Sequence, residues 1–357
     1  MINFTVGPVQ SPDEVRQIGS FNVPYFRTSE FSEVVLESEA LMNKFVNAPS
    51  GSRTLFVTAS GSGGMEAVVM NELSYDDKAL VINGGSFGTR FEQLLDLHNI
   101  EHTTIKLEQG APLTYEDLKP YEDQGYTAFL VNIHETSTGI LYDKELIRDF
   151  CGRNGLFLVV DAISSFLADP LDMQALGADV IVTGSQKALA CAPGICVVVL
   201  SPDAVKRAYN NTCVSMYFDF ESMLENGKRG QTPFTPAVGT ILQIHARLLD
   251  IDKNGGVEAQ IAHTKALAED FRSRVAGLPL SLRLVSPSNA CTYVECKEGS
   301  APVIFEKLKD EYGMWVCPNG GANKEHSFRV GHIGNLTLTD NMELVAALKD
   351  LAHEDIY

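Results

Sequence analysis

The feature that most constrains the fold is one pattern that repeats between residues 54 and 201. A short apolar run, rich in β-branched residues, ends in small or polar residues and is followed by a longer, helix-compatible stretch. The seven runs read TLFVTA, ALVING, HTTIKL, AFLVNI, LFLVVD, VIVTG and CVVVLS. Such runs are typical of strands covered on both faces, and their alternation with helices indicates a mainly parallel sheet. The sequence therefore predicts an α/β fold whose ligand crevice lies beyond the carboxyl ends of the strands.

The chain beyond residue 236 is organised differently. Long helix-like stretches are separated there by a few short strand-like pieces. We expect helices over residues 236–249, 257–275 and 342–351, and strand-like pieces around residues 282–296 and 315–317. These elements predict a smaller α+β domain over residues 251–357, beside a large domain over residues 1–250. Residues 1–18 are a candidate to pack on the smaller domain.

The charge balance argues against two classes of partner. The 357 residues include 28 Lys and Arg against 46 Asp and Glu, a net charge of −18. Such an acidic chain repels phosphate backbones and anionic membrane surfaces. The longest apolar stretches, such as residues 196–200, are far shorter than the roughly 20 residues that span a bilayer. We therefore expect neither nucleic acid nor a membrane as a partner.

The seven cysteines are an odd number at irregular spacings. This usage argues against a disulfide framework and for a reducing compartment. The sequence also opens without a basic segment followed by an apolar one, so we expect a cytoplasmic protein. The pairs Cys191/Cys196 and Cys291/Cys296 lack the two-residue gap and the histidine partners of a zinc site. We therefore expect no metal.

Two residues of opposite charge follow consecutive strand-like runs. Lys187 comes directly after VIVTG, and Asp161 closes LFLVVD. An ionised carboxylate at the end of a buried strand needs a cationic or strongly donating partner. One interpretation is a direct pair between Lys187 and Asp161. The other is a heteroaromatic cation between them, as in pyridoxal phosphate, which needs a lysine amine and an acid at its ring nitrogen.

A Gly- and Ser-rich segment follows the first run. Ser60, Gly61 and Ser62 come before MEAVVMNEL, which fits a helix. The N–H groups at such a helix start can hold a cofactor phosphate, although an ordinary turn has the same composition. The segment has neither the GK[ST] ending of a P-loop nor the GxGxxG pattern of a dinucleotide site. A nicotinamide-dependent dehydrogenase therefore loses support.

The order and spacing of these motifs resemble those of one family. Residues 60–62, Asp161 and residues 185–187 occur as in the class V aminotransferases, which are pyridoxal-phosphate enzymes of fold type I. Within this family the chain is most similar to the alanine/serine–glyoxylate and 2-aminoethylphosphonate–pyruvate aminotransferases. The likeness extends from TVGPV at Thr5 to FRVGHIG at Phe328. It implies a mainly parallel seven-stranded sheet in the large domain and a smaller C-terminal domain.

The resemblance implies roles around the cofactor ring. Lys187 would bind pyridoxal phosphate as a Schiff base and then move the proton of the amino donor as general base and acid. Asp161 would pair with the ring nitrogen. Phe87 matches the aromatic residue that stacks on the ring, and Thr136 matches the hydroxyl residue near the ring O3′. A packed loop aromatic and an ordinary turn hydroxyl are the alternatives at these two positions. For His134, and for the glutamate after it, we expect only structural roles.

The resemblance also assigns the cofactor phosphate. Ser60, Gly61 and Ser62 would form its binding loop, with backbone N–H groups of Gly61 and Ser62 as donors. Gln186 would add a side-chain donor. The loop lies at an expected helix start, which is a favourable place for an anion.

The segment GQTPFTPAVG resembles the one that, in the family, reaches the neighbouring subunit's site. Thr235 is the better candidate for bonding the partner's cofactor phosphate, and Thr232 is the second. Because Thr235 precedes Pro236, a plain helix cap is the alternative. The resemblance therefore implies an obligate homodimer.

Arg329, in SFRVGHIG, matches the family arginine that holds the substrate carboxylate, and its fork-shaped side chain suits a bidentate pair. A strand-surface arginine is the alternative. Gly7 and Pro8 resemble the N-terminal loop that folds over the substrate. Arg27 matches a recurring segment without an assigned role.

Taken together, we expect an aminotransferase that moves an amino group from 2-aminoethylphosphonate, alanine or serine to pyruvate or glyoxylate by a ping-pong mechanism. The donor itself stays open. The main rival is a lyase such as a cysteine desulfurase with Cys317 as nucleophile, although WVCP places this thiol at the end of an apolar run. A binding protein without catalysis is disfavoured by the retained Lys187 and Asp161.

Overall fold

The seven apolar runs form the strands of one sheet, as the sequence predicts. The computed structural model describes residues 1–354 and 356, and the strand order in this sheet is β2-β10-β9-β8-β5-β3-β4. The strands are β2 (Arg53–Thr58), β3 (Lys78–Asn83), β4 (Glu101–Lys106), β5 (Ala128–Asn132), β8 (Phe157–Asp161), β9 (Val180–Gly184) and β10 (Ile195–Leu200). Within the sheet only β10 is antiparallel to its neighbours. The carboxyl ends of the other six strands therefore lie at one edge.

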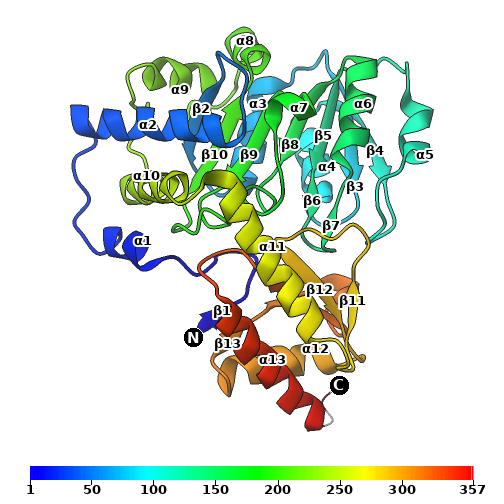
Figure 1. Cartoon of the computed structure of the whole chain (residues 1–357). Helices are drawn as coiled ribbons and strands as arrows, with labels where there is room; N and C mark the ends of the chain where they lie inside the picture. Colours follow the sequence, from blue (N-terminus) through cyan, green and yellow to red (C-terminus); the bar gives the residue numbers. More distant parts are fainter. Residues whose placement is uncertain (355, 357) are drawn as a thin grey trace.

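Helices cover both faces of this sheet (Figure 1), which explains why its inner strands are apolar throughout. Along β10, Val197 and Val199 belong to one core cluster, and Val198 and Leu200 belong to the other. The helices on the first face are α2 (Ser29–Phe45), α6 (Lys144–Asn154), α7 (Met173–Leu176) and α10 (Val238–Lys253). The helices on the second face are α3 (Gly61–Glu72), α4 (Gly88–Leu97), α8 (Pro202–Asn210) and α9 (Phe220–Gly227).

A second sheet, with four antiparallel strands, lies at the other end of the molecule (Figure 1). Its order is β11 (Ser281–Arg283), β12 (Cys291–Glu295), β15 (Ser327–Gly331) and β14 (Cys317–Pro318). Helices α11 (Gly256–Arg274), α12 (Ser300–Asp310) and α13 (Leu338–His353) share a third core cluster with it. The first strand, β1 (Ile2–Asn3), pairs with β13 (Met314–Trp315), and Phe4 belongs to the same cluster. We propose the boundary between the two domains near residue 250, at the end of α10.

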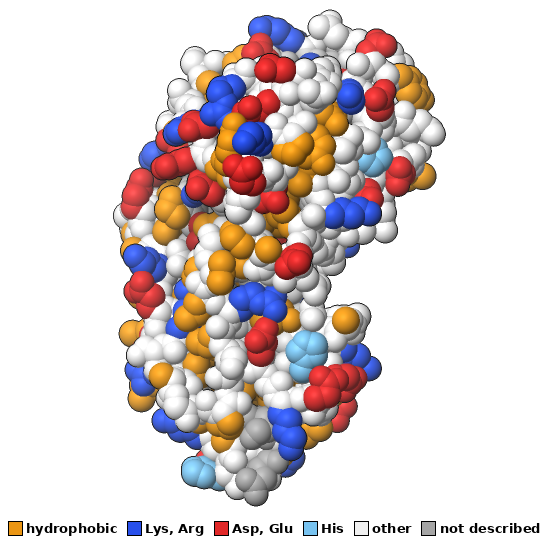
Figure 2. All heavy atoms as spheres, turned by 90° about the vertical axis from the view of Figure 1, so that its right-hand side faces the viewer, with side chains coloured by type: hydrophobic (Ala, Val, Ile, Leu, Met, Phe, Trp, Pro, Cys, Tyr) orange, Lys and Arg blue, Asp and Glu red, His pale blue; other side chains and the backbone are white. Residues whose placement is uncertain are grey.

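Short elements complete the described part of the chain. They are α1 (Asp13–Ile18), α5 (Tyr115–Leu118), the pair β6 (His134–Glu135) and β7 (Ile140–Leu141), and 3₁₀ turns at Lys119–Tyr121 and Gly321–Asn323. None of the helices in residues 1–354 is long and apolar enough to cross a membrane. Figure 2 shows acidic and basic side chains intermixed on one face, and a surface that is hollowed between the larger upper and the smaller lower part.

The helix expected from Pro236 begins two residues later. Its N-cap is Ala237, which offers no side-chain cap, and helix α10 starts at Val238. The N–H of Ala237 donates to the Thr58 hydroxyl at 3.1 Å instead of joining the helix. Thr235 is therefore not a helix cap, so the plain-cap alternative for this residue is wrong.

Candidate active site

Lys187 lies in the turn after β9, where its amine meets the N-terminal segment. Its Nζ donates to the main-chain oxygen of Val6 at 2.5 Å. Gly7 has a φ of +122°, and a Cβ there would lie 2.9 Å from the Lys187 Nζ, so only glycine lets this segment pass so close. Burial is the main cause that lowers the pKa of Lys187. A desolvated amine of this kind loses its proton more readily and is a better nucleophile.

Asp161 ends β8, the strand next to β9, and its carboxylate is buried with few partners. It accepts one hydrogen bond, from the N–H of Ile163 at 2.8 Å. Burial raises the pKa of Asp161 to about 7, and the charge of Lys187 opposes this effect. Among the described residues Lys187 and Asp161 form no ion pair with each other, so the direct-pair interpretation is wrong. A buried acid this poorly paired fits a protonated ring nitrogen.

The Gly- and Ser-rich segment starts helix α3, with Ser60 as its cap. The Ser60 hydroxyl accepts from the N–H of Gly63 at 3.4 Å. At Gly61 a Cβ would lie 2.5 Å from Cδ1 of Ile163, two residues after Asp161, so the helix start approaches the end of β8 closely. The free N–H groups and the helix dipole at this start favour an anion.

Arg90 brings a positive charge to this segment, which the sequence did not indicate. Its Nη1 donates to the Ser62 hydroxyl at 2.5 Å, and its guanidinium lies 5.3 Å from the centre of the Phe87 ring. Its charge also opposes the effect of burial, which raises the pKa of Asp161. Arg90 thus lies between the anion-binding helix start, the aromatic ring and the buried acid. The sequence offered only one indication of this role for Arg90, namely that a basic residue follows a strand-end loop in the first turn of the next helix.

Thr136 and Arg329 meet at the same place, although Thr136 lies in the turn after β6 and Arg329 in β15 of the small sheet. Nη1 of Arg329 donates to the main-chain oxygen of Thr136 at 3.1 Å, and its Nη2 donates to that of Pro318 at 3.0 Å. The buried Nε of Arg329 has no partner within the described structure. The guanidinium is therefore fixed by two carbonyls while it keeps N–H donors for an anion.

Gln186 and Pro8 are two further predicted residues beside Lys187. The Gln186 amide oxygen is buried without a hydrogen-bond partner in the described part of the chain. The main-chain oxygen of Pro8 accepts from the side chains of Asn3 and Thr5 at 2.9 and 2.8 Å. This tightens the turn that passes over Lys187.

Thr232 and Thr235 lie on a separate loop of the same subunit. The Thr232 hydroxyl donates to the main-chain oxygen of Phe234 at 2.7 Å, and Thr235 is exposed. In the described residues neither hydroxyl is hydrogen-bonded to Lys187 or to other predicted site residues. Arg27 holds this loop by donating to the main-chain oxygens of Thr232 at 2.6 Å and Pro233 at 3.0 Å. The structure thus gives Arg27 the role that the sequence left open.

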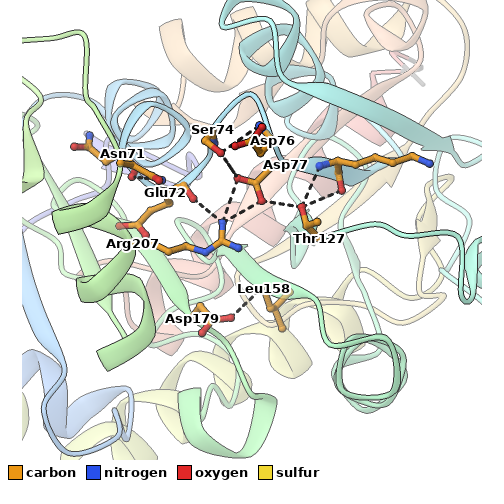
Figure 3. A network of polar contacts seen from close by, with 11 residues as sticks. Asn71, Glu72, Ser74, Asp76, Asp77, Thr127, Leu158, Asp179 and Arg207 are labelled. Carbon is orange, nitrogen blue, oxygen red and sulfur yellow. Dashed lines mark hydrogen bonds and ion pairs between the residues drawn. The ribbon is translucent and has the colours of Figure 1, made fainter.

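A network of polar contacts around Asp77 and Arg207 (Figure 3) lies at the amino ends of the strands, which is the opposite edge of the large sheet. Asp77, just before β3, accepts from Nη1 of Arg207 at 3.2 Å and from the Thr127 hydroxyl at 2.7 Å. Arg207 also donates to the main-chain oxygen of Glu72 at 2.9 Å. Because Asp77 and Arg207 pair with each other at the amino ends of the strands, we assign them to the stability of the fold and not to the site.

A cavity of about 1000 Å³ also lies away from Lys187 and Asp161, between α2, α6, α7 and α11. Its lining mixes charges of both signs, and Lys44 pairs with Asp252 there at 2.5 Å. The described residues contain no group of three side chains that could hold a metal ion. The groups with reactive or unpaired polar atoms described above therefore lie at the strand ends around Lys187, and not in this cavity.

Comparison with known proteins gives a consistent result. The family model described as aminotransferase class-V matches residues 23–310. The chain is 28% identical to the small subunit of a soluble hydrogenase from Synechococcus sp., over 98% of this chain and 92% of that one. It is 27% identical to an L-aspartate–glyoxylate aminotransferase from Paracoccus denitrificans, over 94% and 86% of the two chains. It is 25% identical to a 2-aminoethylphosphonate–pyruvate transaminase from Salmonella dublin, over 97% and 96%.

The fold is similar to that of a solved enzyme. The crystal structure of an aspartate aminotransferase from Thermus thermophilus superposes with a TM-score of 0.91, with 25% identity over 99% of each chain. The matched family model and the similar fold point to the same family. The chain belongs to the class-V aminotransferase family and is a pyridoxal-phosphate-dependent aminotransferase.

Proposed function

We propose that this enzyme transfers an amino group from a small donor (2-aminoethylphosphonate, alanine or serine) to pyruvate or glyoxylate by a ping-pong mechanism. The observation that carries the proposal is the pair of strand-end groups at the site. One is the desolvated amine of Lys187, and the other is the under-paired carboxylate of Asp161. Relatives named for glyoxylate and pyruvate support the choice of acceptor.

Bound pyridoxal phosphate supplies the electron sink that makes the carbon next to the donor nitrogen acidic. Lys187 holds the cofactor and moves this proton, a task suited to an amine whose pKa burial lowers. Asp161 would keep a proton on the ring nitrogen, Phe87 would stack on the ring, and the Thr136 hydroxyl would bind near the ring O3′.

The phosphate group is assigned to the start of α3. Ser60, Gly61 and Ser62 would supply backbone and hydroxyl donors, and Gln186 would supply the NH2 group of its side-chain amide. Arg90 adds a positive charge beside Ser62. The helix dipole acts in the same direction.

Substrate selection is assigned to Arg329. The acceptors carry a carboxylate, and the guanidinium, held by Thr136 and Pro318, has donors left to bind it. Gly7 and Pro8 form the segment beside the Lys187 amine, and so close the site from the N-terminal side.

We propose a homodimer in which the loop of Thr232 and Thr235 completes the partner's site. Exposed apolar side chains are grouped beside this loop: Val214 is 81% exposed, Met216 79% and Tyr217 39%, and Tyr217 stacks on Phe234 at 5.4 Å between ring centres. A group of exposed apolar side chains, unlike a single one, is typical of an interface. Sedimentation tests the dimer, because a fully active monomer would contradict it.

The seven unpaired cysteines support a cytoplasmic location.

Desulfuration of cysteine is the second candidate, and one observation favours it. Cys317 lies opposite Arg329, the proposed substrate-binding residue, in the β14–β15 pair. However, Cys317 is part of a strand, whereas a desulfurase needs its thiol on a mobile loop. Release of sulfide from cysteine, abolished by Cys317→Ala, would favour this candidate.

The decisive experiment follows the bound cofactor during each half-reaction. A yellow protein should lose its colour with the right amino donor and regain it with pyruvate or glyoxylate. Offering 2-aminoethylphosphonate, alanine and serine separately identifies the donor. Lys187→Ala should abolish both colour changes. Failure of the cofactor to respond to any of the three donors would overturn the proposal.

A further inference from the structure

A chain of four buried side chains ends at Thr136. The Thr136 hydroxyl lies 2.6 Å from the Ser164 hydroxyl, which lies 2.9 Å from Nδ1 of His134. Nε2 of His134 lies 3.8 Å from Sγ of Cys291. All four residues are at most 5% exposed. These hydrogen bonds therefore connect the segments that follow β5 and β8 with β12 of the small sheet, and all four side chains are shielded from water.

The protonation states of His134 and Cys291 determine which atom donates and which accepts in this chain of hydrogen bonds. Burial, together with the positive charges of Lys187 and Arg329, lowers the pKa of His134 to about 3, so the imidazole is neutral. Burial also raises the pKa of Cys291 to about 12, so its thiol keeps its proton. A neutral imidazole has one N–H and one lone pair. Because a thiol donates better to an imidazole nitrogen than sulfur accepts from N–H, we assign Nε2 as the acceptor and place the proton on Nδ1.

The direction continues to Thr136. Nδ1–H of His134 donates to the Ser164 oxygen, so the Ser164 hydrogen is directed at the Thr136 oxygen. The Thr136 hydrogen is then left for another acceptor. Among the described residues it reaches only the main-chain oxygen of His134, at a long 3.5 Å. A better-placed oxygen would replace this weak contact.

We propose that His134 and Ser164 are positioning residues that turn the Thr136 hydroxyl into a donor for the anionic ring oxygen of the cofactor. The inference rests on the proposed function, because it uses the position of Thr136 beside the ring. It goes beyond that function by assigning a task to His134, which sequence reasoning treated as structural. Hydroxyls in such a chain donate more strongly than isolated ones.

Ser164→Ala tests the chain, and Ser165→Ala is the matched control. Ser165 is the next residue, equally buried, and its hydroxyl has no partner in the described structure. We expect Ser164→Ala to raise the Kd of the apo-protein for pyridoxal phosphate about 3- to 10-fold. We also expect the colour change of the bound cofactor to move to higher pH, because the anionic oxygen loses a donor. Ser165→Ala should change neither quantity, and equal effects of both substitutions would overturn the proposal.

A double-mutant cycle shows whether the effect passes through Thr136. Ser164→Ala should cost nothing further in a Thr136→Ala background, whereas full additivity would overturn the relay. His134→Asn, which keeps an N–H near the place of Nδ1, should retain more affinity than His134→Leu. Equal losses would overturn the part assigned to His134. Melting temperatures of the apo-proteins identify general destabilisation. If the unchanged protein bound no pyridoxal phosphate, the proposed function would fail together with this inference.

Discussion

Glu135 fixes the loop of Phe87: its carboxylate accepts hydrogen bonds from the backbone N–H groups of Phe87 at 3.2 Å and Gly88 at 3.1 Å. The same fully buried carboxylate accepts from the Asn132 side chain at 2.9 Å and from the N–H of Ser137 at 3.2 Å. A buried carboxylate is tolerated only when donors surround it in this way. The position of the aromatic ring at the site thus depends on a residue outside its own loop.

Glu135→Gln is expected to raise the Kd for pyridoxal phosphate about tenfold or more and to lower the melting temperature. The new amide N–H would face backbone donors, and one unpaired buried group costs about 1–3 kcal/mol. Titration of the apo-protein with the cofactor measures the effect. Glu145→Gln, on the exposed side of α6, is the control. Unchanged affinity in Glu135→Gln would show that the loop does not need this anchor.

Arg329→Ala should weaken the use of the 2-oxo acid much more than cofactor binding. Loss of an Arg–carboxylate pair in a desolvated site costs about 2–5 kcal/mol, which corresponds to a fall of roughly thirtyfold or more in kcat/KM. Arg329→Lys should recover only part of this, because an ammonium lacks the fork geometry. If kcat/KM and cofactor affinity fell in parallel, the role in substrate binding would be wrong.

Asp161→Asn should stabilise the apo-protein at alkaline pH while it weakens the cofactor's chemistry. The folded-state pKa of about 7 lies above the ordinary value of 3.8. The folded protein therefore binds more protons than the unfolded chain between these values, and its stability falls as pH rises through them. Urea unfolding at pH 5 and pH 8 should give a larger gain for Asp161→Asn at pH 8. The exposed Asp76→Asn is the control, and a gain independent of pH would contradict the assignment.

The residues at the strand ends could be predicted because the strands are specified by short stretches of the sequence. The continuous apolar runs specify strands buried on two faces, and parallel strands bring their carboxyl ends to one edge. Lys187 and Asp161 were therefore recognisable from their positions after two runs. The start of α10 was not, because the N–H of Ala237 bonds to Thr58, which lies far away in the sequence.

Two residues that support the site were missed for the same reason. Arg90 and Ser164 act through partners on other segments, and the sequence around them offers at most the place of Arg90 in the first turn after a strand-end loop. Glu135 was expected to have a structural role, and its contacts with the backbone of Phe87 and Gly88 are of that kind. Sequence reasoning finds groups whose chemistry is unusual for their place. It does not find ordinary polar residues whose importance arises from the fold that surrounds them.

A buried acid far from the site gives the last prediction. Glu72 ends helix α3 beside the charge network of Figure 3, but neither of its carboxylate oxygens has a partner in the described structure. Arg207 donates to its main-chain oxygen instead. Burial raises the pKa of Glu72 well above 4.5, against the opposing charge of Arg207. The folded protein therefore carries this side chain in its neutral form at pH values where the unfolded chain has lost the proton.

Glu72→Gln should therefore increase the free energy of unfolding at pH 8 and have a smaller effect near pH 5. Between the two pKa values the unfolded state releases a proton that the folded state keeps, which lowers stability by about 1.4 kcal/mol per pH unit. Glutamine has nearly the same shape and no proton to lose, so it removes this dependence. Urea unfolding of the apo-protein at both pH values measures it, with the exposed Glu343→Gln as control. Equal effects at the two pH values would mean that Glu72 is ionised in the folded protein, and that a donor reaches it after all.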